Sequence, residues 1–175
     1  MTATEKQAAQ KRAAQMLADA RIVVPQNILD DMEIVHFGLG EPEITGLQII
    51  IYVNNDRYCA KELVMFPGQT CPEHRHPDGA DYTGKRETFY VRFGEVSLFV
   101  PGKPAAKPSV APPAAPAGSY TVFHEIKLNA GDQHTIEPDT LHWFKAGPRG
   151  AIVSEFSSTS RDGTDIFSDP RVKRV

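Results

Sequence analysis

The sequence has few cysteines and no long apolar run. Only Cys59 and Cys71 are present among 175 residues, and no stretch is apolar enough to cross a bilayer. The first part of the chain is polar and rich in alanine, without the apolar core that a signal peptide needs. Two cysteines without a secretory signal are typical of free thiols in a reducing compartment. We therefore expect a cytoplasmic protein without a disulfide.

The sequence also lacks an excess of basic charge. Its net charge is −3, with 19 Lys and Arg against 22 Asp and Glu, and the basic residues form no extended run. A protein whose main partner is a nucleic acid or an anionic membrane surface normally carries a positive patch. Walker loops, dinucleotide fingerprints and zinc-knuckle spacings are absent as well. These absences favour a small-molecule partner.

The patterning predicts an all-β fold behind one helix. Residues 4–20 contain neither glycine nor proline and predict a helix. A chain of this length buries one substantial core, so we expect a helical extension at 1–20 and a single domain at 21–175. Residues 47–53 and 58–66 predict two strands joined by a turn, and further short strands follow. This succession is typical of an antiparallel sandwich or barrel.

Residues 101–118 interrupt the strand pattern. They are dominated by proline and alanine. Proline has no backbone N–H to donate to a ladder, so a regular strand is excluded here. We expect a loop inside the domain.

A His-x-His pair predicts a metal site. His74 and His76 lie two residues apart, so on a β-strand both side chains project from the same face. Glu87 follows on the next predicted strand, and His142 begins a later one. Three imidazoles and one carboxylate suit Mn, Fe, Co, Ni or Zn. We therefore expect these four residues to hold a divalent transition metal.

The strand that carries Glu87 also brings a lysine to the site. Residues 85–91 are rich in β-branched and aromatic side chains, and Gly94 predicts a turn where the strand closes. Side chains two residues apart share a face, so Lys85 should lie in the same cavity as Glu87. By the same alternation, Phe144 shares the face of His142 and should wall the pocket.

These residues fall on a known pattern. The spacing from Gly68 to Gly94 resembles the first cupin motif, and Gly131 to His142 resembles the second. Further segments resemble the D-lyxose isomerase family: Cys71–His76, Gly84–Phe89, His142–Phe144, Ser154–Ser157 and Asp165–Arg171. The resemblance implies a cupin β-barrel of jelly-roll type. It also implies a sugar ketol-isomerase that interconverts D-lyxose and D-xylulose, and D-mannose and D-fructose, by enediol proton transfer.

Coordination number bears on the choice of metal. An octahedral ion with four protein ligands keeps two open positions, whereas tetrahedral zinc would be saturated. Two adjacent open positions fit O1 and O2 of an open-chain aldose. Mn²⁺, which the resemblance also implies, is therefore the expected cofactor, with other divalent transition metals as alternatives. Because cupins commonly pair through edge strands, we also expect a homodimer.

The resemblance extends to the catalytic and substrate-binding residues. We assign Glu155 as the base that moves the proton between C2 and C1, and Asp165 as its partner or a substrate contact. Lys85 would stabilise the developing negative charge or bind a sugar hydroxyl. Arg161 would bind substrate or orient the two carboxylates, and Tyr82 would act from a loop over the pocket.

Three other functions use the same ligands. A cupin phosphoglucose isomerase would need a cluster of phosphate donors, which the sequence does not clearly supply. A cupin dioxygenase would hold iron and bind dioxygen at the open positions. A sugar-binding or storage cupin would use the metal only for structure, and Lys85, Glu155 and Asp165 count against it.

Overall fold

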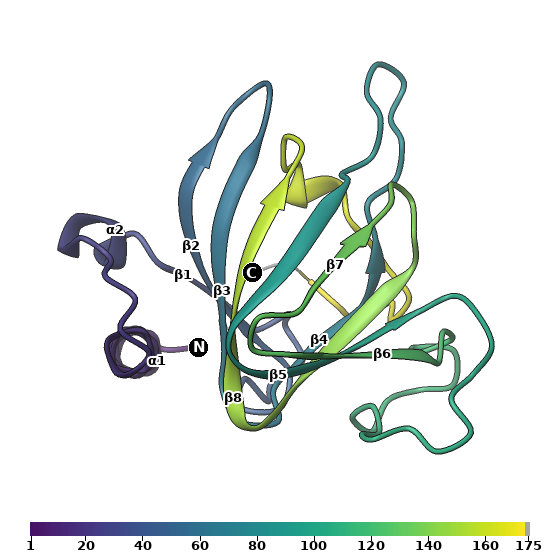
Figure 1. Cartoon of the computed structure of the whole chain (residues 1–175), viewed down its shortest axis with the longest axis horizontal. Helices are drawn as coiled ribbons and strands as arrows, with labels where there is room; N and C mark the ends of the chain where they lie inside the picture. Colours follow the sequence, from purple (N-terminus) through teal and green to yellow (C-terminus); the bar gives the residue numbers. More distant parts are fainter. Residues whose placement is uncertain (174–175) are drawn as a thin grey trace.

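The computed structural model describes residues 1–173 (Figure 1). Its elements in chain order are α1 (Ala3–Asp19), α2 (Gln26–Asp30), β1 (Glu33–Val35), β2 (Leu47–Asn54), β3 (Cys59–Met65), β4 (Thr70–Arg75), β5 (Glu87–Val100), β6 (His124–Asn129), β7 (Gln133–Ile136), β8 (His142–Ser157), the 3₁₀ turn η1 (Asp162–Thr164) and β9 (Ile166–Phe167). The all-β fold with an N-terminal helix is confirmed. Neither described helix combines the length and the apolar character that crossing a membrane requires.

Helix α1 covers part of the outer face of the barrel. The hydroxyl of Thr2 accepts a hydrogen bond from the backbone N–H of Glu5, whose carboxylate accepts one from the backbone N–H of Thr2. This capping box satisfies two donors at the start of the helix. Ala13 and Leu17 are buried and pack against apolar side chains of β2, β3 and β8. The helix predicted for residues 4–20 is thus confirmed.

Two long strands, β5 and β8, hold the barrel together. They pair antiparallel along most of their length, from Glu87 opposite Ser157 to Phe99 opposite Trp143. The first half of β5 also pairs with β7 and its second half with β6. The first half of β8 also pairs with β4 and its second half with β3. Each long strand therefore belongs to both layers, and the sheet curls into a two-layered barrel (Figure 1).

The turn predicted at Gly94 is wrong, because β5 continues to Val100. Gly94 lies between two shifts of register with β8, where the strand bends. Its φ is 72°, and Gly150 near it on β8 has a φ of 78°. Glycine adopts this left-handed conformation without steric cost, and within a strand it often marks a bend at a barrel corner. Gly94 therefore marks a change of direction within the strand and not its end.

Replacing Gly94 by alanine is expected to destabilise the fold. A Cβ atom there would overlap the carbonyl oxygen of Gly150. Left-handed strain alone costs on the order of 1–3 kcal/mol, and the overlap adds to it. Urea unfolding should therefore show a loss of more than about 2 kcal/mol. Gly118→Ala, at a φ of 86° with open space around the new Cβ, should lose less. Equal losses in the two variants would contradict the close approach of the strands.

The Pro/Ala-rich residues 101–118 form the expected loop between β5 and β6, packed on the outside of the barrel. Trp143 lies beneath this loop. Its ring stacks on Phe99 with 3.9 Å between centroids, and its indole N–H donates to the carbonyl of Val122. The next residue, Phe144, belongs to the barrel interior. Of the two aromatic residues after His142, only Phe144 therefore lies on the side of the pocket.

Strand β4 is anchored by Glu73, whose side chain is fully buried. Its carboxylate accepts hydrogen bonds from the backbone N–H groups of Thr121 and Val122 and from the hydroxyl of Ser168. Hydrogen bonds to a charged acceptor are roughly twice as strong as neutral ones. These bonds tie β4 to two distant segments and hold the backbone that carries His74.

Candidate metal and catalytic site

The four predicted metal ligands meet inside the barrel. His74 on β4 lies opposite His142 at the start of β8. His76 follows the end of β4, and Glu87 begins β5. All four are at most 6% exposed. One nitrogen from each histidine lies within 4.8 Å of the other two, so the three imidazoles can reach one ion.

Hydrogen bonds at Nδ1 orient the imidazoles. Nδ1 of His74 and of His142 each lies 2.8 Å from the backbone carbonyl oxygen two residues earlier. Nδ1 of His76 lies 2.6 Å from a carboxylate oxygen of Asp165. Because these oxygens only accept, each Nδ1 donates its proton. Nε2 is therefore the ring nitrogen available to ligate an ion in each histidine, the arrangement of metal sites whose histidines are oriented by an outer carboxylate or carbonyl.

One ring nitrogen of the cluster is unsatisfied. Nε2 of His142 is buried and has no hydrogen-bond partner among residues 1–173. Oε1 of Glu87 lies 3.1 Å from this atom and 3.2 Å from Nε2 of His76. A buried polar atom without a partner is costly, and an ion bound by these atoms would satisfy it. The donor set of three imidazoles and a carboxylate therefore fits a divalent transition metal.

Burial and nearby charges shift the pKa values of the cluster. Burial, assisted by the other two imidazoles, holds the pKa of His74 well below its usual value. Burial acts in the same direction on His76, but Glu87 and Asp165 outweigh it and raise the pKa of His76 to about 9. Burial opposes the charge of Glu87, yet Lys85 and His76 hold its pKa well below the usual range. In the metal-free cluster His76 is therefore positively charged at neutral pH, whereas His74 is neutral.

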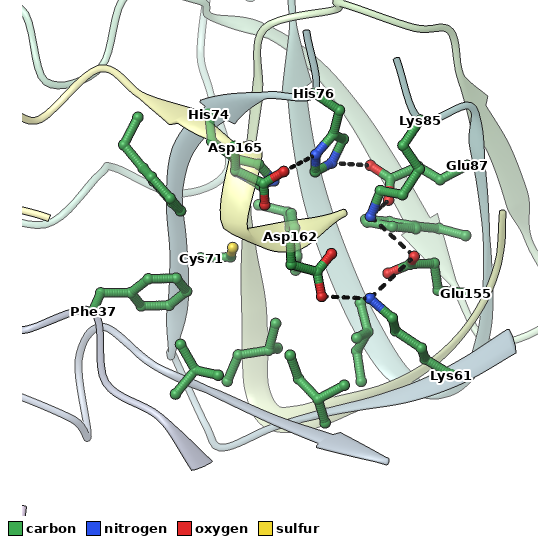
Figure 2. Close-up of a pocket in the computed structure, with 17 residues that line it drawn as sticks. Phe37, Lys61, Cys71, His74, His76, Lys85, Glu87, Glu155, Asp162 and Asp165 are labelled. Carbon is green, nitrogen blue, oxygen red and sulfur yellow. Dashed lines mark hydrogen bonds and ion pairs between the residues drawn. The ribbon is translucent and has the colours of Figure 1, made fainter. Parts of the chain in front are cut away.

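A pocket opens beside the ligands. Its empty volume, which includes open solvent at the mouth, is about 430 Å³. Figure 2 shows its polar side chains gathered on one side, away from Phe37. The apolar lining residues are Val35, Phe37, Leu47, Ile49, Leu63, Cys71, Phe89, Phe144 and Phe167. The prediction that Phe144 walls the pocket agrees with this arrangement.

The polar side of the pocket is a chain of alternating charges. Consecutive members lie 2.6 to 3.9 Å apart, in the order Asp165, His76, Glu87, Lys85, Glu155, Lys61 and Asp162. The first and last members of this row of charges, Asp165 and Asp162, both come from the short segment at η1 (Figure 2). Each buried charge thus has an opposite charge beside it, as burial of ions requires.

Glu155 has one carboxylate oxygen held by the protein and the other turned to the pocket. Oε1 accepts hydrogen bonds from Nζ of Lys85 at 3.0 Å and from the hydroxyl of Ser157 at 3.2 Å, and it lies 3.9 Å from Nζ of Lys61. Within residues 1–173 no hydrogen bond or ion pair reaches Oε2, which points toward the centre of the pocket in Figure 2. Such an oxygen can accept a proton from a bound molecule.

Lys85 reaches the pocket from outside a strand. The strand predicted to begin at Lys85 is wrong by two residues, because β5 begins at Glu87. Its Nζ nevertheless lies 2.6 Å from Oε2 of Glu87 and 3.0 Å from Oε1 of Glu155. The side chain is 8% exposed. It therefore bridges the candidate ligand and the candidate base.

Arg161 and Tyr82 lie at a smaller hollow next to the pocket. The guanidinium carbon of Arg161 is 4.3 Å from the ring centroid of Tyr82, a cation–π contact. Lys85 and Asp165 also line this hollow. Lysines, and not Arg161, hold Glu155, so the expected orienting role of Arg161 toward Glu155 is not supported by the contacts.

Sequence reasoning missed two charged residues of the pocket, Lys61 and Asp162. Lys61 lies on β3 two residues before Leu63, and both side chains face the pocket. A lysine at an inward position of an apolar strand is the signal that could have found it. Both cysteines are buried and neither forms a disulfide, and Cys71 also lines the pocket.

Comparison with known proteins gives two kinds of match, although no family model matches the chain. The chain is 55% identical over 166 residues to a D-lyxose/D-mannose isomerase of Thermosediminibacter oceani, covering 95% of this chain and 92% of the relative. It is 53% identical over 175 residues to a D-lyxose ketol-isomerase of Cohnella laeviribosi, covering 100% and 96%. A D-lyxose ketol-isomerase of a Thermofilum species is 54% identical over 167 residues, covering 95% and 93%.

Solved structures are similar at much lower identity. An L-ribose isomerase of an Acinetobacter species in complex with L-ribose has a TM-score of 0.76 at 18% identity, covering 98% of this chain and 94% of that one. The L-ribose isomerase of Geodermatophilus obscurus has a TM-score of 0.75 at 18% identity, covering 100% and 98%. Matches at this identity show the fold alone. They confirm the all-β cupin barrel.

Proposed function

Since the chain belongs to the D-lyxose ketol-isomerase family, we propose that this aldose–ketose isomerase interconverts D-lyxose with D-xylulose, and D-mannose with D-fructose. The observation that carries the proposal is the position of Glu155. Lys85 and Ser157 donate hydrogen bonds to Oε1 of Glu155, while its Oε2 faces the pocket. The carboxylate lies beside a cluster of histidines suited to a metal. A sugar isomerase needs such a base next to an electrophile.

We assign Mn²⁺ to His74, His76, Glu87 and His142. When bound, the ion would polarise the carbonyl group of the open-chain sugar as a Lewis acid. The unsatisfied Nε2 of His142 and the two carbonyl-oriented rings support a metal at this position. Asp165 accepts a hydrogen bond from Nδ1 of His76, so its role is to orient that ligand.

Glu155 moves the proton in this proposal. Its Oε2 takes the proton from C2 of the aldose and returns it to C1, while a hydroxyl proton passes from O2 to O1 through the enediol. The hydrogen bond from Lys85 to Oε1 holds the carboxylate in place, so that the same oxygen, Oε2, serves both steps in the proposal. Lys85 also places a positive charge beside the site where the sugar oxygens become negative.

The smaller hollow suits the far end of the open-chain sugar. Its lining residues include Arg161, Tyr82, Thr159 and Thr164, whose side chains carry guanidinium, phenol and hydroxyl groups. These groups can bind sugar hydroxyls by hydrogen bonds, and an aromatic ring can cover the C–H face of a sugar. Phe144 would form part of the apolar wall along the carbon chain.

The test is isomerisation by metal-stripped protein, with D-lyxose and D-mannose as substrates and ketose as the product followed. We expect ketose with added Mn²⁺ and none without it. The two initial rates would also rank the sugars. Absence of ketose with any divalent ion, in protein shown by calorimetry to bind that ion, would contradict the proposed activity.

Metal binding should release protons in a pH-dependent way. His76 has a raised pKa of about 9, so it is protonated at neutral pH and must lose the proton to ligate an ion. We expect about one proton released per ion at pH 7, decreasing as the pH rises through 9. Calorimetry in buffers of different ionisation enthalpy measures this number. Release that stays constant between pH 7 and pH 10 would show that His76 does not pass from protonated to ligated.

A further inference from the structure

Lys61 is a buried charge without a role in the chemistry described so far. It lies on β3, faces the pocket, and is only 2% exposed. Burying an ammonium group is unfavourable until its partners compensate for the lost hydration. Replacing a buried ion pair by apolar residues is often neutral or stabilising. Stability alone therefore does not explain a lysine at this position.

The ammonium group of Lys61 joins three groups from one stretch of the chain. Its Nζ donates to the hydroxyl of Ser160 at 2.8 Å and to Oδ2 of Asp162 at 2.9 Å. It also lies 3.9 Å from Oε1 of Glu155. Ser160 in turn donates to Asp162. On β3, which pairs with the end of β8, Lys61 lies opposite Glu155, so its side chain ties the η1 turn to this pair of strands (Figure 2).

Two elements of the site depend on this connection. One is the carboxylate of Glu155. Lys61, Lys85 and Ser157 all approach its Oε1, so its Oε2 faces the pocket. The other is η1, which is followed directly by the carboxylate that orients the ring of His76. A single lysine therefore contacts both the base and the turn that leads to a ligand-orienting residue.

We infer that Lys61 is a positioning residue, which holds Glu155 and the η1 turn in the geometry needed for proton transfer. The inference rests on the proposed isomerase function. We assign Lys61 no proton exchange with the sugar, because Ser160 and Asp162 take two of its N–H donors and the carboxylate of Glu155 lies 3.9 Å from its Nζ. Its contribution should therefore appear in the rate of the chemical step and not in substrate affinity.

The experiment compares Lys61→Met, Asp162→Asn and the double variant in Mn²⁺-loaded protein with D-lyxose. Lys61→Met should lower kcat about 100-fold, the effect of roughly 1 Å of misplacement, with KM within about threefold of wild type. Asp162→Asn should lower kcat less. The double variant should be no slower than Lys61→Met, because the two residues act as one unit. Lys145→Met is the control for loss of a lysine on the barrel, since its Nζ bonds only a carbonyl of the outer loop among described residues.

The double variant guards against a folding defect. Lys61→Met removes one partner of the Asp162 carboxylate and can lower stability, whereas the double variant removes both charges. A stable double variant with kcat within threefold of wild type would overturn the positioning role. So would an equal loss of kcat in Lys145→Met. Failure of wild-type protein to form ketose at all would instead refute the proposed function.

Discussion

Replacing Glu155 by glutamine is expected to lower kcat for D-lyxose by roughly 10²–10⁴-fold while Mn²⁺ binding stays unchanged. The amide has the same shape as the carboxylate, and its oxygen can still accept the hydrogen bonds from Lys85 and Ser157. What it loses is the ability to take up a proton at Oε2. Steady-state kinetics, with the metal content of each preparation measured in parallel, gives both quantities.

Glu62→Gln is the matched control for this variant. Glu62 is also 3% exposed and also hydrogen-bonded by a serine, but it lies on β3 and is not among the residues that line the pocket. We expect it to leave kcat within about threefold, because changes away from the reacting groups have small effects. A Glu155→Gln enzyme that turns over at the wild-type rate would remove Glu155 from the role of base.

Replacing Glu87 by glutamine is expected to remove metal binding and activity together. Oε1 of Glu87 lies 3.1 and 3.2 Å from the ring nitrogens of His142 and His76, and an amide is a weaker ligand than a carboxylate. Since the loss of an outer-shell partner already costs about 10–100-fold in metal affinity, we expect a loss of at least 100-fold.

Titration with Mn²⁺, followed by the electron paramagnetic resonance of the free ion, measures the affinity of Glu87→Gln. Its kcat should recover in part at high Mn²⁺, in contrast to Glu155→Gln, which should stay slow at full occupancy. This contrast separates a ligand from a base. Unchanged Mn²⁺ affinity in Glu87→Gln would exclude Glu87 from the metal site.

The cluster of His74, His76 and His142 could be predicted in part because strand periodicity is local. His74 and His76 share a face if one strand continues through both. Strand β4 ends at Arg75, one residue before His76, yet both imidazoles are buried in the same cluster. The position of Glu155 could be assigned only through the family resemblance. Nothing in its local sequence shows that one oxygen is bound and the other faces a pocket, because the lysines that hold Oε1 come from other parts of the chain.

The missed features all depend on contacts between distant segments. Gly94 gives the same local signal for a turn and for a bend, and only the pairing of β5 with β8 over both layers decides between them. Lys61 and Asp162 are 101 residues apart in the sequence, so the ion pair between them has no local pattern. Lys85 is predicted correctly to lie in the cavity, although the strand begins two residues later than predicted. Its ion pair with Glu87 holds its side chain there.

The central claim is that a protein base moves a proton between two carbons of the sugar, and isomerisation in deuterated water tests it most directly. Oε2 of Glu155 faces a pocket with an open mouth, so the abstracted proton should exchange with solvent before it returns. The account predicts that D-xylulose formed from D-lyxose carries measurable deuterium at C1. D-xylulose free of deuterium after many turnovers would contradict it, since hydrogen would then pass directly from C2 to C1 without an exchangeable base.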